Sequence, residues 1–442
     1  MRIYGKTLSE IFVDIPWQLK IIILVGVMFI PFAIIRAGYV YLTFGQIFNK
    51  PSLTRFNGVP ENLGALDPSL TEGDNKKIYM VYTSLKDQAF SNGLLAAFPV
   101  TQLAFSNPPC SSWTYMSDLF EPRGMEEIVG PDGATPLSTA IWATETPTAI
   151  YDPNDPGKEF KFYAFRYFWA DAKNRRDLAA YYGVIVYRSA HDAVKHENWG
   201  SEEWLFSAKR GQPPEPYGDL VQYHLNDLDP SLKDIYYYAR PSAVMMGDVY
   251  YMTLSGFITG RTTADRVIMI SSPDRGRTWQ YAGTLLKHDD VAKMGPFSEL
   301  SGGTLFLRKG ALYFATVFGG EKKSAAGTFI LRFEDPATAR LAMNPKTGLP
   351  AIVKRVPPNS GAPSGGGGGF ATYHDKCGKQ GVIVSELSGI KRKFQIFNSA
   401  KEPVDDSVAT EGKYSSFVWA GVTVIAMLLL MVVFIRRNEK NV

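Results

Sequence analysis

Ser272-Pro273-Asp274-Arg275-Gly276-Arg277-Thr278-Trp279 lies between two runs of strand-forming residues and has the chemistry of a tight turn. The Asp274 side chain can accept hydrogen bonds from neighbouring backbone N–H groups. Gly276 can supply a left-handed backbone conformation, and Trp279 can bury its ring under the turn. This octapeptide therefore predicts a β-hairpin whose turn is held by its own side chains.

The same order of residues occurs twice more along the chain: a strand that ends in Ser, a loop, a Trp and another strand. The spacing from Ser to Trp is seven residues for Ser106 and Trp113, ten for Ser189 and Trp199, and seven for Ser272 and Trp279. Because repetition of this kind is hard to obtain by chance, we interpret it as a repeated unit of sheet rather than a set of unrelated hairpins.

Strand-like runs recur in five groups, which span residues 77–120, 148–206, 242–286, 303–333 and 370–397. Aromatic residues make up 13% of the chain, which favours strands over helices. Radial arrays of small antiparallel sheets are β-propellers, which typically have about four to eight blades. The sequence predicts an all-β fold, a β-propeller with five blades, or with six if the loops hide further strands.

The octapeptide matches the pattern S-x-D-x-G-x-T-W at every fixed position, with Ser272, Asp274, Gly276, Thr278 and Trp279. This pattern is the Asp-box, or BNR repeat, and residues 76–400 thus resemble the sialidase-like and five-bladed glycosidase-type β-propellers. The resemblance implies a structural role for the motif, because Asp-boxes lie in peripheral turns of such proteins. It departs from the sialidases in having one intact box and no arginine triad that can be assigned.

Charged residues precede several of the expected inner strands. The resemblance to five-bladed glycosidases implies carboxylates around the central channel, and aligning the strands places Glu145, Arg240 and Glu299 at one mouth. Glycoside hydrolysis needs two such carboxylates, and an arginine between them would keep one ionised. We expect Glu299 to be the general acid and Glu145 its partner. The alternative is a structural or ligand-binding set of charges, in which Arg240 neutralises both glutamates.

Other site chemistry is sparse. Cys110 and Cys377 are the two cysteines, and they could form one disulfide outside the cytoplasm or remain as two buried thiols. The five histidines have no metal-binding spacing and no phosphate-binding loop is present, so the sequence predicts no metal and no cofactor. Residues 356–369 are rich in Pro and Gly, which predicts a linker, or a close approach of backbones near the channel.

Uncharged apolar runs flank the body, at Ile21–Ile35 and Phe417–Ile435. A helix of the second run would be about 28 Å long, which is enough to cross a bilayer. The domain plan is a tail over 1–19, a transmembrane helix over 20–44, a linker over 45–75, the propeller over 76–400, a linker over 401–414, a transmembrane helix over 415–435 and a tail over 436–442. A cleaved signal peptide is the alternative for the first run.

Lys and Arg residues in both tails predict that both termini are cytoplasmic and that the propeller is periplasmic or extracellular. No Asn-x-Ser/Thr site is present, which favours a bacterial source. Arg36 continues the first apolar run. It would either contact another membrane protein or lie at the outer interface of a shorter span.

These features favour a non-catalytic accessory, structural or recognition subunit of a membrane assembly, because two anchors would fix the orientation of the propeller over the bilayer. The expected partners are lipid, other membrane subunits and a glycan. Nucleic acid is excluded, since the net charge of +4 is mild and no basic stretch is dense. The alternative is a membrane-bound glycoside hydrolase that uses the carboxylates at the channel mouth.

Overall fold

The computed structural model describes residues 2–3, 6–7, 52–53, 55–57, 64–89, 95–120, 123–129, 136–170, 182–209, 218–261, 263–295, 297–319, 328–356, 371–378, 381–387 and 394–398. Both apolar runs, Arg36, the linker over 401–414 and the tail over 436–442 lie outside these residues. Within the described ranges, no helix has the length and apolar character needed to cross a membrane.

The chain divides into two compact units, Met1–Lys50 and Pro51–Val442. In the first unit, β1 (Arg2–Ile3) and β2 (Lys6–Thr7) pair antiparallel. All other described elements belong to the second unit, and the rest of the fold concerns that unit alone.

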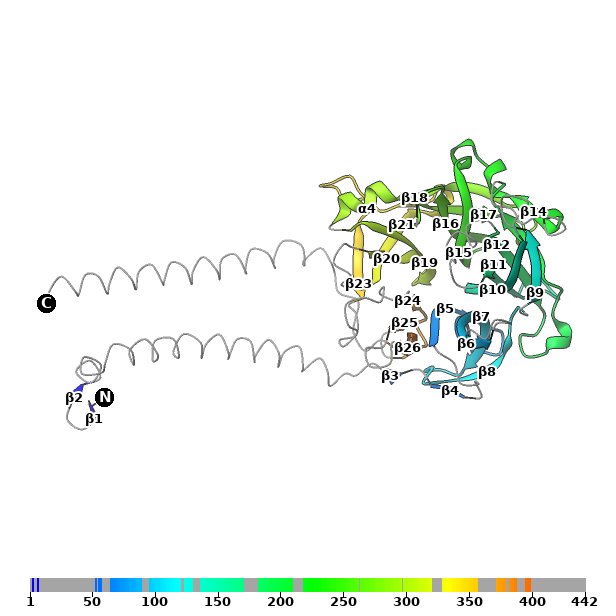
Figure 1. The fold of residues 1–442 in the computed structure, drawn as a ribbon. Helices are drawn as coiled ribbons and strands as arrows, with labels where there is room; N and C mark the ends of the chain where they lie inside the picture. The colour runs from blue at the N-terminus through cyan, green and yellow to red at the C-terminus, as the bar shows by residue number, and fades with distance from the viewer. Residues whose placement is uncertain are drawn as a thin grey trace. The chain divides into compact units, whose positions relative to one another are not determined.

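Five sheets of the second unit are seen in Figure 1. The first holds β4 (Arg55–Asn57), β5 (Gly64–Glu72), β6 (Ile78–Ala89), β7 (Leu95–Ser106) and β8 (Ser112–Asp118). The second holds β9 (Arg123–Val129), β10 (Pro136–Tyr151), β11 (Phe160–Ala170), β12 (Val184–Ala190), β13 (Glu203–Ser207) and β14 (Val221–His224). The third holds β15 (Ile235–Met246), β16 (Val249–Ile258), β17 (Arg266–Ser272) and β18 (Gln280–Lys287).

The fourth sheet holds β19 (Glu299–Arg308), β20 (Ala311–Gly319), β21 (Thr328–Asp335), β22 (Arg340–Leu341) and β23 (Ile352–Val356). The fifth holds β24 (Ala371–Tyr373), β25 (Val382–Leu387), β26 (Phe394–Asn398) and β3 (Ser52–Leu53). Between the third and fourth sheets lies α4 (His288–Met294), and short 3-10 helices cover His196–Asn198, Gly218–Leu220, Leu225–Asp227, Pro230–Leu232 and Pro336–Thr338.

The sheets form a β-propeller. The inner strands β5, β10, β15, β19 and β24 contact one another in a closed circuit, and Figure 1 shows them nearest the common centre. Four blades consist of consecutive strands, whereas the fifth sheet is completed by β3 from far upstream. The prediction of five blades, or of six, is therefore corrected to four blades and one composite sheet. The reason is that β3 is only two residues long and has no pattern of its own.

The segment over 45–75, for which the sequence predicts a linker, is mostly strand where the structure describes it. It contains β3, β4 and β5, and β5 is the inner strand of the first blade. The sequence misleads here because Asp67-Pro68 is a typical turn signal. In the structure these two residues form a bulge within the strand, and pairing with β6 resumes at Ser69.

The octapeptide at 272–279 joins β17 to β18 with the contacts expected of it. The backbone N–H of Thr278 donates to Asp274 Oδ1 over 2.8 Å, and the Ser272 hydroxyl donates to the same oxygen over 2.9 Å. Gly276 has a φ of +87°. Trp279 is 4% exposed and packs edge-on against Phe206 of the second blade, with ring centroids 5.4 Å apart. The turn therefore also stabilises the contact between two blades.

Cys110 and Cys377 form a disulfide with a Cα–Cα distance of 4.9 Å. Cys110 follows β7 in the first blade and Cys377 follows β24 in the fifth sheet. Next to the disulfide, the Gly378 N–H donates to the Pro109 carbonyl over 2.8 Å, and Lys376 pairs with Glu72. The first and last sheets of the circuit are thus linked covalently as well as by packing.

Candidate functional site

The inner strands of the four blades share a bulge. The register with the next strand shifts between Leu66 and Ser69, Glu145 and Thr148, Ala239 and Ser242, and Leu300 and Gly303. At three of the bulges a residue other than glycine has a positive φ, which is 52° for Asp67, 49° for Thr146 and 56° for Arg240. Bulges redirect side chains, and strained backbone of this kind is common at functional sites. The repeat therefore marks one end of the channel as the candidate site.

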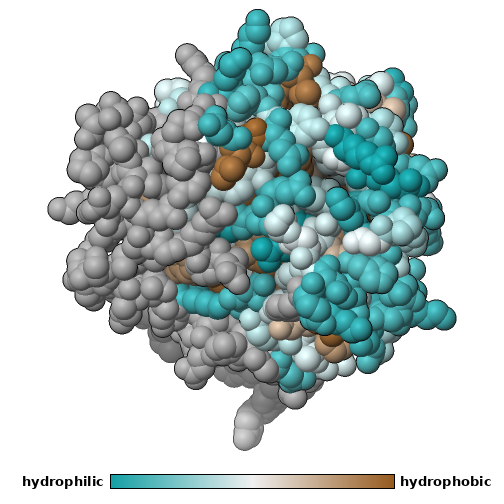
Figure 2. Space-filling model, turned by 90° about the vertical axis from the view of Figure 1, so that its right-hand side faces the viewer, coloured by the Kyte–Doolittle hydropathy of each residue, from teal (hydrophilic) through white to brown (hydrophobic). Residues whose placement is uncertain are grey.

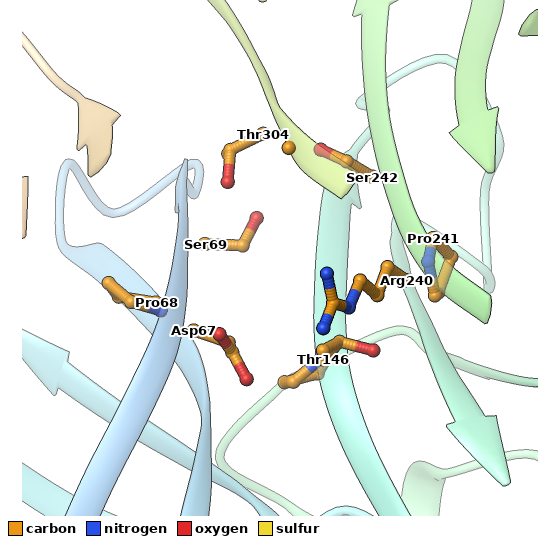
Figure 3. A pocket seen from close by; sticks show the side chains of 10 residues that line it. Asp67, Pro68, Ser69, Thr146, Arg240, Pro241, Ser242 and Thr304 are labelled. Carbon is orange, nitrogen blue, oxygen red and sulfur yellow. The ribbon is translucent and has the colours of Figure 1, made fainter. Parts of the chain in front are cut away.

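A pocket lies among these bulges. It is lined by Asp67, Pro68, Ser69, Thr146, Pro147, Arg240, Pro241, Ser242, Gly303 and Thr304, and its empty volume is about 280 Å³ when the solvent at its mouth is included. Figure 3 shows the side chains of Asp67 and Arg240 extending toward each other from opposite walls, with Thr146 beside the guanidinium. A carboxyl group from the first blade and a guanidinium group from the third blade thus face the same pocket.

Hydroxyl groups hold the inner strands together behind this pocket. Ser69 Oγ lies 3.2 Å from Thr148 Oγ1, and the Ala243 N–H donates to Thr148 Oγ1 over 2.9 Å. The Leu305 N–H donates to Ser242 Oγ over 2.8 Å. Each Ser or Thr that follows a bulge therefore bonds to the next blade, which fixes the positions of the charged residues beside it.

The pKa of Asp67 is raised to about 7, first by burial and second by the nearby negative charge of Glu145. Arg240 acts against this shift, as does Thr83, whose hydroxyl lies 3.5 Å from Asp67 Oδ2. Burial also raises the pKa of Glu145, whereas Arg240 and the Tyr167 hydroxyl favour its charged form. The Tyr167 hydroxyl donates to Glu145 Oε2 over 3.1 Å. Asp67, Glu145 and Arg240 thus form one electrostatically coupled group.

Arg240 is held in place by its surroundings. Its guanidinium donates to the Ser301 hydroxyl on β19. A Cβ atom at Gly302 would lie 2.8 Å from Arg240 Cδ, so glycine leaves room there for the arginine stem. Burial raises the pKa of Tyr237 to about 12, with Arg240 and Glu145 as opposing influences, which places this phenol in the same group of charges.

Four aromatic rings extend the site from Glu145. Phe165 and Tyr167 stack with centroids 5.0 Å apart, Phe165 stacks on Tyr237 at 6.3 Å, and Tyr237 stacks on Phe257 at 4.3 Å. Tyr237 is partly exposed. The other three rings are buried, so Tyr237 alone could offer an aromatic face, beside hydrogen-bonding groups, to the apolar face of a sugar ring.

Glu299 is not brought into this group. It is exposed, it lies at the first position of β19, and it does not line the pocket. The bulge of β19 falls at Ser301 and Gly302, so Ser301 is the structural equivalent of Asp67 and Arg240. The sequence alignment was therefore displaced by two residues in this blade, which lacks the Pro that marks the bulge in the other three.

Asp67 was missed by the sequence analysis, although a signal was present. Asp67-Pro68-Ser69, Thr146-Pro147-Thr148 and Arg240-Pro241-Ser242 repeat one pattern, any residue followed by Pro and then Ser or Thr. Among the described residues, no group of three or more His, Cys, Asp or Glu side chains could hold a metal ion. The described chemistry of the site is thus that of carboxylates, a guanidinium and phenols.

No family model matches the chain, and no curated protein does. Solved structures similar to this one include a Hadza microbial sialidase, with 10% identity, a TM-score of 0.39 and coverage of 74% of this chain and 57% of that one. A variant of the α-L-arabinanase of Cellvibrio cellulosa has 12% identity, a TM-score of 0.36 and coverage of 64% and 75%.

A family 117 glycoside hydrolase produced by the marine bacterium Zobellia galactanivorans has 12% identity, a TM-score of 0.42 and coverage of 82% of this chain and 97% of that one. The structural neighbours are thus a sialidase and other glycosidases with propeller folds, the same groups that the Asp-box and the blade pattern resemble. At these identities and TM-scores, function is argued below from the site itself.

Proposed function

We propose that this protein is a glycoside hydrolase whose working carboxylates are Asp67 and Glu145. The observation that carries the proposal is the coupled group at the bulges, in which Asp67 has a pKa of about 7 and interacts with the charge of Glu145. Hydrolysis of a glycosidic bond needs one carboxyl group that is protonated and one that is ionised at the working pH. Asp67, with a pKa of about 7, would supply the protonated group, and Glu145, whose charged form is favoured by Arg240 and Tyr167, would supply the ionised one.

The surroundings assign the two roles. Burial is the main cause that keeps a proton on Asp67, and the charge of Glu145 adds to it. Arg240 and Tyr167 favour the charged form of Glu145 against the effect of its own burial. Asp67 would therefore protonate the leaving-group oxygen, and Glu145 would act as base or nucleophile on the other side of the sugar. The bulge of β5 places Asp67 in the lining of the pocket, and Glu145 directly precedes Thr146, the bulge residue of β10 that lines the same pocket.

The test is a screen of nitrophenyl glycosides of pentoses and hexoses with wild-type protein, followed by kinetics of Asp67→Asn and Glu145→Gln. We expect each substitution to lower kcat/KM by about 10²–10⁴, the usual contribution of an acid or base. Glu299→Gln is the matched control, because Glu299 is exposed outside the pocket, and its kcat/KM should stay near that of the wild type. Absence of hydrolysis, or full activity of Asp67→Asn, would overturn the proposal.

The two apolar runs support a further proposal on location, with residues 20–44 and 415–435 anchoring the propeller at a membrane and the propeller outside the cytoplasm. The support is their length and the Lys and Arg residues beside them. Extraction of membranes with alkaline carbonate should leave the chain in the pellet, and protease added outside spheroplasts should cut the propeller. Release by carbonate would contradict this proposal.

A second candidate function is an accessory subunit of a membrane assembly. It is favoured by Arg36, since a charge within an apolar run needs a partner or an interface. Gentle detergent extraction followed by native mass spectrometry should then recover the chain with other membrane subunits. Recovery of a single, monodisperse chain would count against this function and leave the hydrolase proposal intact.

A further inference from the structure

A second hollow lies between the fourth blade and the fifth sheet. Its walls come from β19, β20, β21 and β23 on one side and from β24 on the other, and it shares no lining residue with the central pocket. Its empty volume, together with the solvent at its mouth, is about 400 Å³. The hollow is therefore a separate candidate site on the same body.

The packing at this seam is thin. The buried hydrophobic cluster here consists of Phe306, Ala315, Ile330, Val356 and Ala371. In contrast, the cluster that spans the second, third and fourth blades includes many large aromatic and aliphatic side chains, among them Tyr163, Phe206 and Trp279. Among the described residues, the buried cluster at this seam is therefore smaller than the one that spans the second, third and fourth blades.

Aromatic side chains form much of the wall. Phe306 and Tyr313 are stacked, with ring centroids 5.5 Å apart and an interplanar angle of 11°. The ring centroids of Phe306 and Tyr373 are 5.7 Å apart. Tyr313 and Tyr373 are partly exposed. Aromatic surface of this kind, with phenol hydroxyls and the Thr372 hydroxyl nearby, suits a ring that has an apolar face and polar edges.

The charge of the hollow is positive. Arg308 and Lys354 line it, and none of the described residues in its lining is acidic. The Arg308 guanidinium lies 5.0 Å from the centre of the Tyr373 ring, a cation–π contact that holds it at the wall. Its Nε is shielded from solvent and makes no hydrogen bond within the part of the chain that the structure describes. A carboxylate is the ligand group that best fits a guanidinium, and Arg308 supplies a guanidinium at this wall.

We propose that this hollow binds an acidic sugar, a single ring that carries a carboxylate. The carboxylate would accept hydrogen bonds from Arg308 and gain a second charge contact from Lys354, while the ring packs against Tyr313 and Tyr373. Such a site would hold an acidic unit of a glycan at a seam distant in sequence from Asp67 and Glu145. It does not depend on hydrolysis at the central pocket.

The test is isothermal titration calorimetry of the full chain in detergent. It measures the affinity for D-glucuronate, D-glucose and benzoate. We expect glucuronate to bind, glucose to bind at least about tenfold more weakly, and Arg308→Gln to lose at least about tenfold in affinity for glucuronate. The matched control is Lys293→Gln, which removes an exposed cation from α4 and should leave the affinity unchanged. Asp67→Asn should bind glucuronate as the wild type does, which separates this site from the proposed active site.

Three results would overturn the proposal: no binding of glucuronate, equal binding of glucuronate and benzoate, or wild-type affinity in Arg308→Gln. Circular dichroism establishes whether each variant is folded. Should Arg308→Gln fail to fold, Lys354→Gln tests the same contact. Its affinity must fall for the proposal to stand, because Lys354 lies in the same wall.

Discussion

The ionisation of Asp67 costs more free energy in the folded protein than in the unfolded chain. Its pKa is about 7 in the fold, against an ordinary value of 3.8. Below the lower value both states are protonated, and between the two values only the unfolded chain loses the proton. The folded state therefore loses stability as pH rises toward 7, by roughly 4 kcal/mol at about 1.36 kcal/mol per unit of pKa difference.

Asp67→Asn should remove this loss. The amide has nearly the same shape and does not ionise, so the variant should gain stability relative to the wild type as pH rises from about 4.5 to about 8. Urea unfolding at both pH values measures the difference in free energy of unfolding. Asp227→Asn, which removes an exposed carboxyl group, is the control and should show little change. A gap between Asp67→Asn and wild type that is the same at both pH values would contradict the assigned pKa.

Asp274 is a second residue whose chemistry can be tested alone. It accepts hydrogen bonds from the Thr278 N–H, the Thr278 hydroxyl at 2.7 Å and the Ser272 hydroxyl. Asp274→Ala should lower the free energy of unfolding by about 1–3 kcal/mol, because it leaves these donors without their acceptor. Thermal unfolding measures the effect, and Asp274→Asn should lose less because its amide oxygen still accepts. Equal stability of Asp274→Ala and wild type would show that the turn holds without this side chain.

At the scale of elements, the bulges of the inner strands direct side chains from the sheets into the pocket. The bulge in β5 directs Asp67 into the pocket, and the bulge in β15 does the same for Arg240. The alternation of residues along the sequence predicts which segments are strands, but it does not predict the register between neighbouring strands. A bulge is a shift in that register, so it depends on the partner strand. This is why the sequence aligned Glu299 with Arg240, whereas the structure has Ser301 at the equivalent position of β19.

The disulfide makes a prediction at this scale, because it joins the loop after β7 to the loop after β24. Replacing both cysteines, as Cys110→Ala with Cys377→Ala, should lower the free energy of unfolding by roughly 2–5 kcal/mol. Urea unfolding with and without reductant measures it. The free energy of unfolding of the reduced wild type should approach that of the double variant. The reductant should not change the free energy of unfolding of the double variant. A double variant as stable as oxidised wild type would mean that packing alone closes the circuit.

At the scale of the whole molecule, the circuit of sheets depends on the N-terminal strands of the second unit. β3 pairs with β26 in the fifth sheet, and β4 pairs with β8 in the first blade. Without them the two sheets would expose unpaired strand edges, which promote association. Short strands that carry no pattern in the sequence therefore complete two sheets at once.

Two truncations test this closure. Deletion of residues 1–57 removes β3 and β4, and deletion of residues 1–50 keeps both. The longer deletion should unfold at a lower temperature and aggregate more readily than the shorter one, as read by scanning calorimetry and light scattering. Since both lack the first apolar run, the comparison isolates the two strands. Indistinguishable behaviour of the truncated chains would contradict a role of β3 and β4 in closure.

The sequence by itself determined the local features of this protein: the hairpin turn at 272–279 with Asp274, Gly276 and Trp279, the strands, and the radial arrangement that their repetition implies. These follow from contacts between residues close in the chain. It also singled out Glu145 and Arg240 as candidates, because Thr146-Pro147 and Arg240-Pro241 repeat one pattern along the chain.

Only the tertiary structure decided that Asp67 belongs to the site, that Glu299 does not line the pocket, and that β3 completes the last sheet. The pKa of Asp67 depends on burial by neighbouring blades and on charges from two other inner strands. None of these neighbours is close to Asp67 in the sequence. Electrostatic coupling acts through space, and the register of each strand is set by its partner, so neither can be read along one chain.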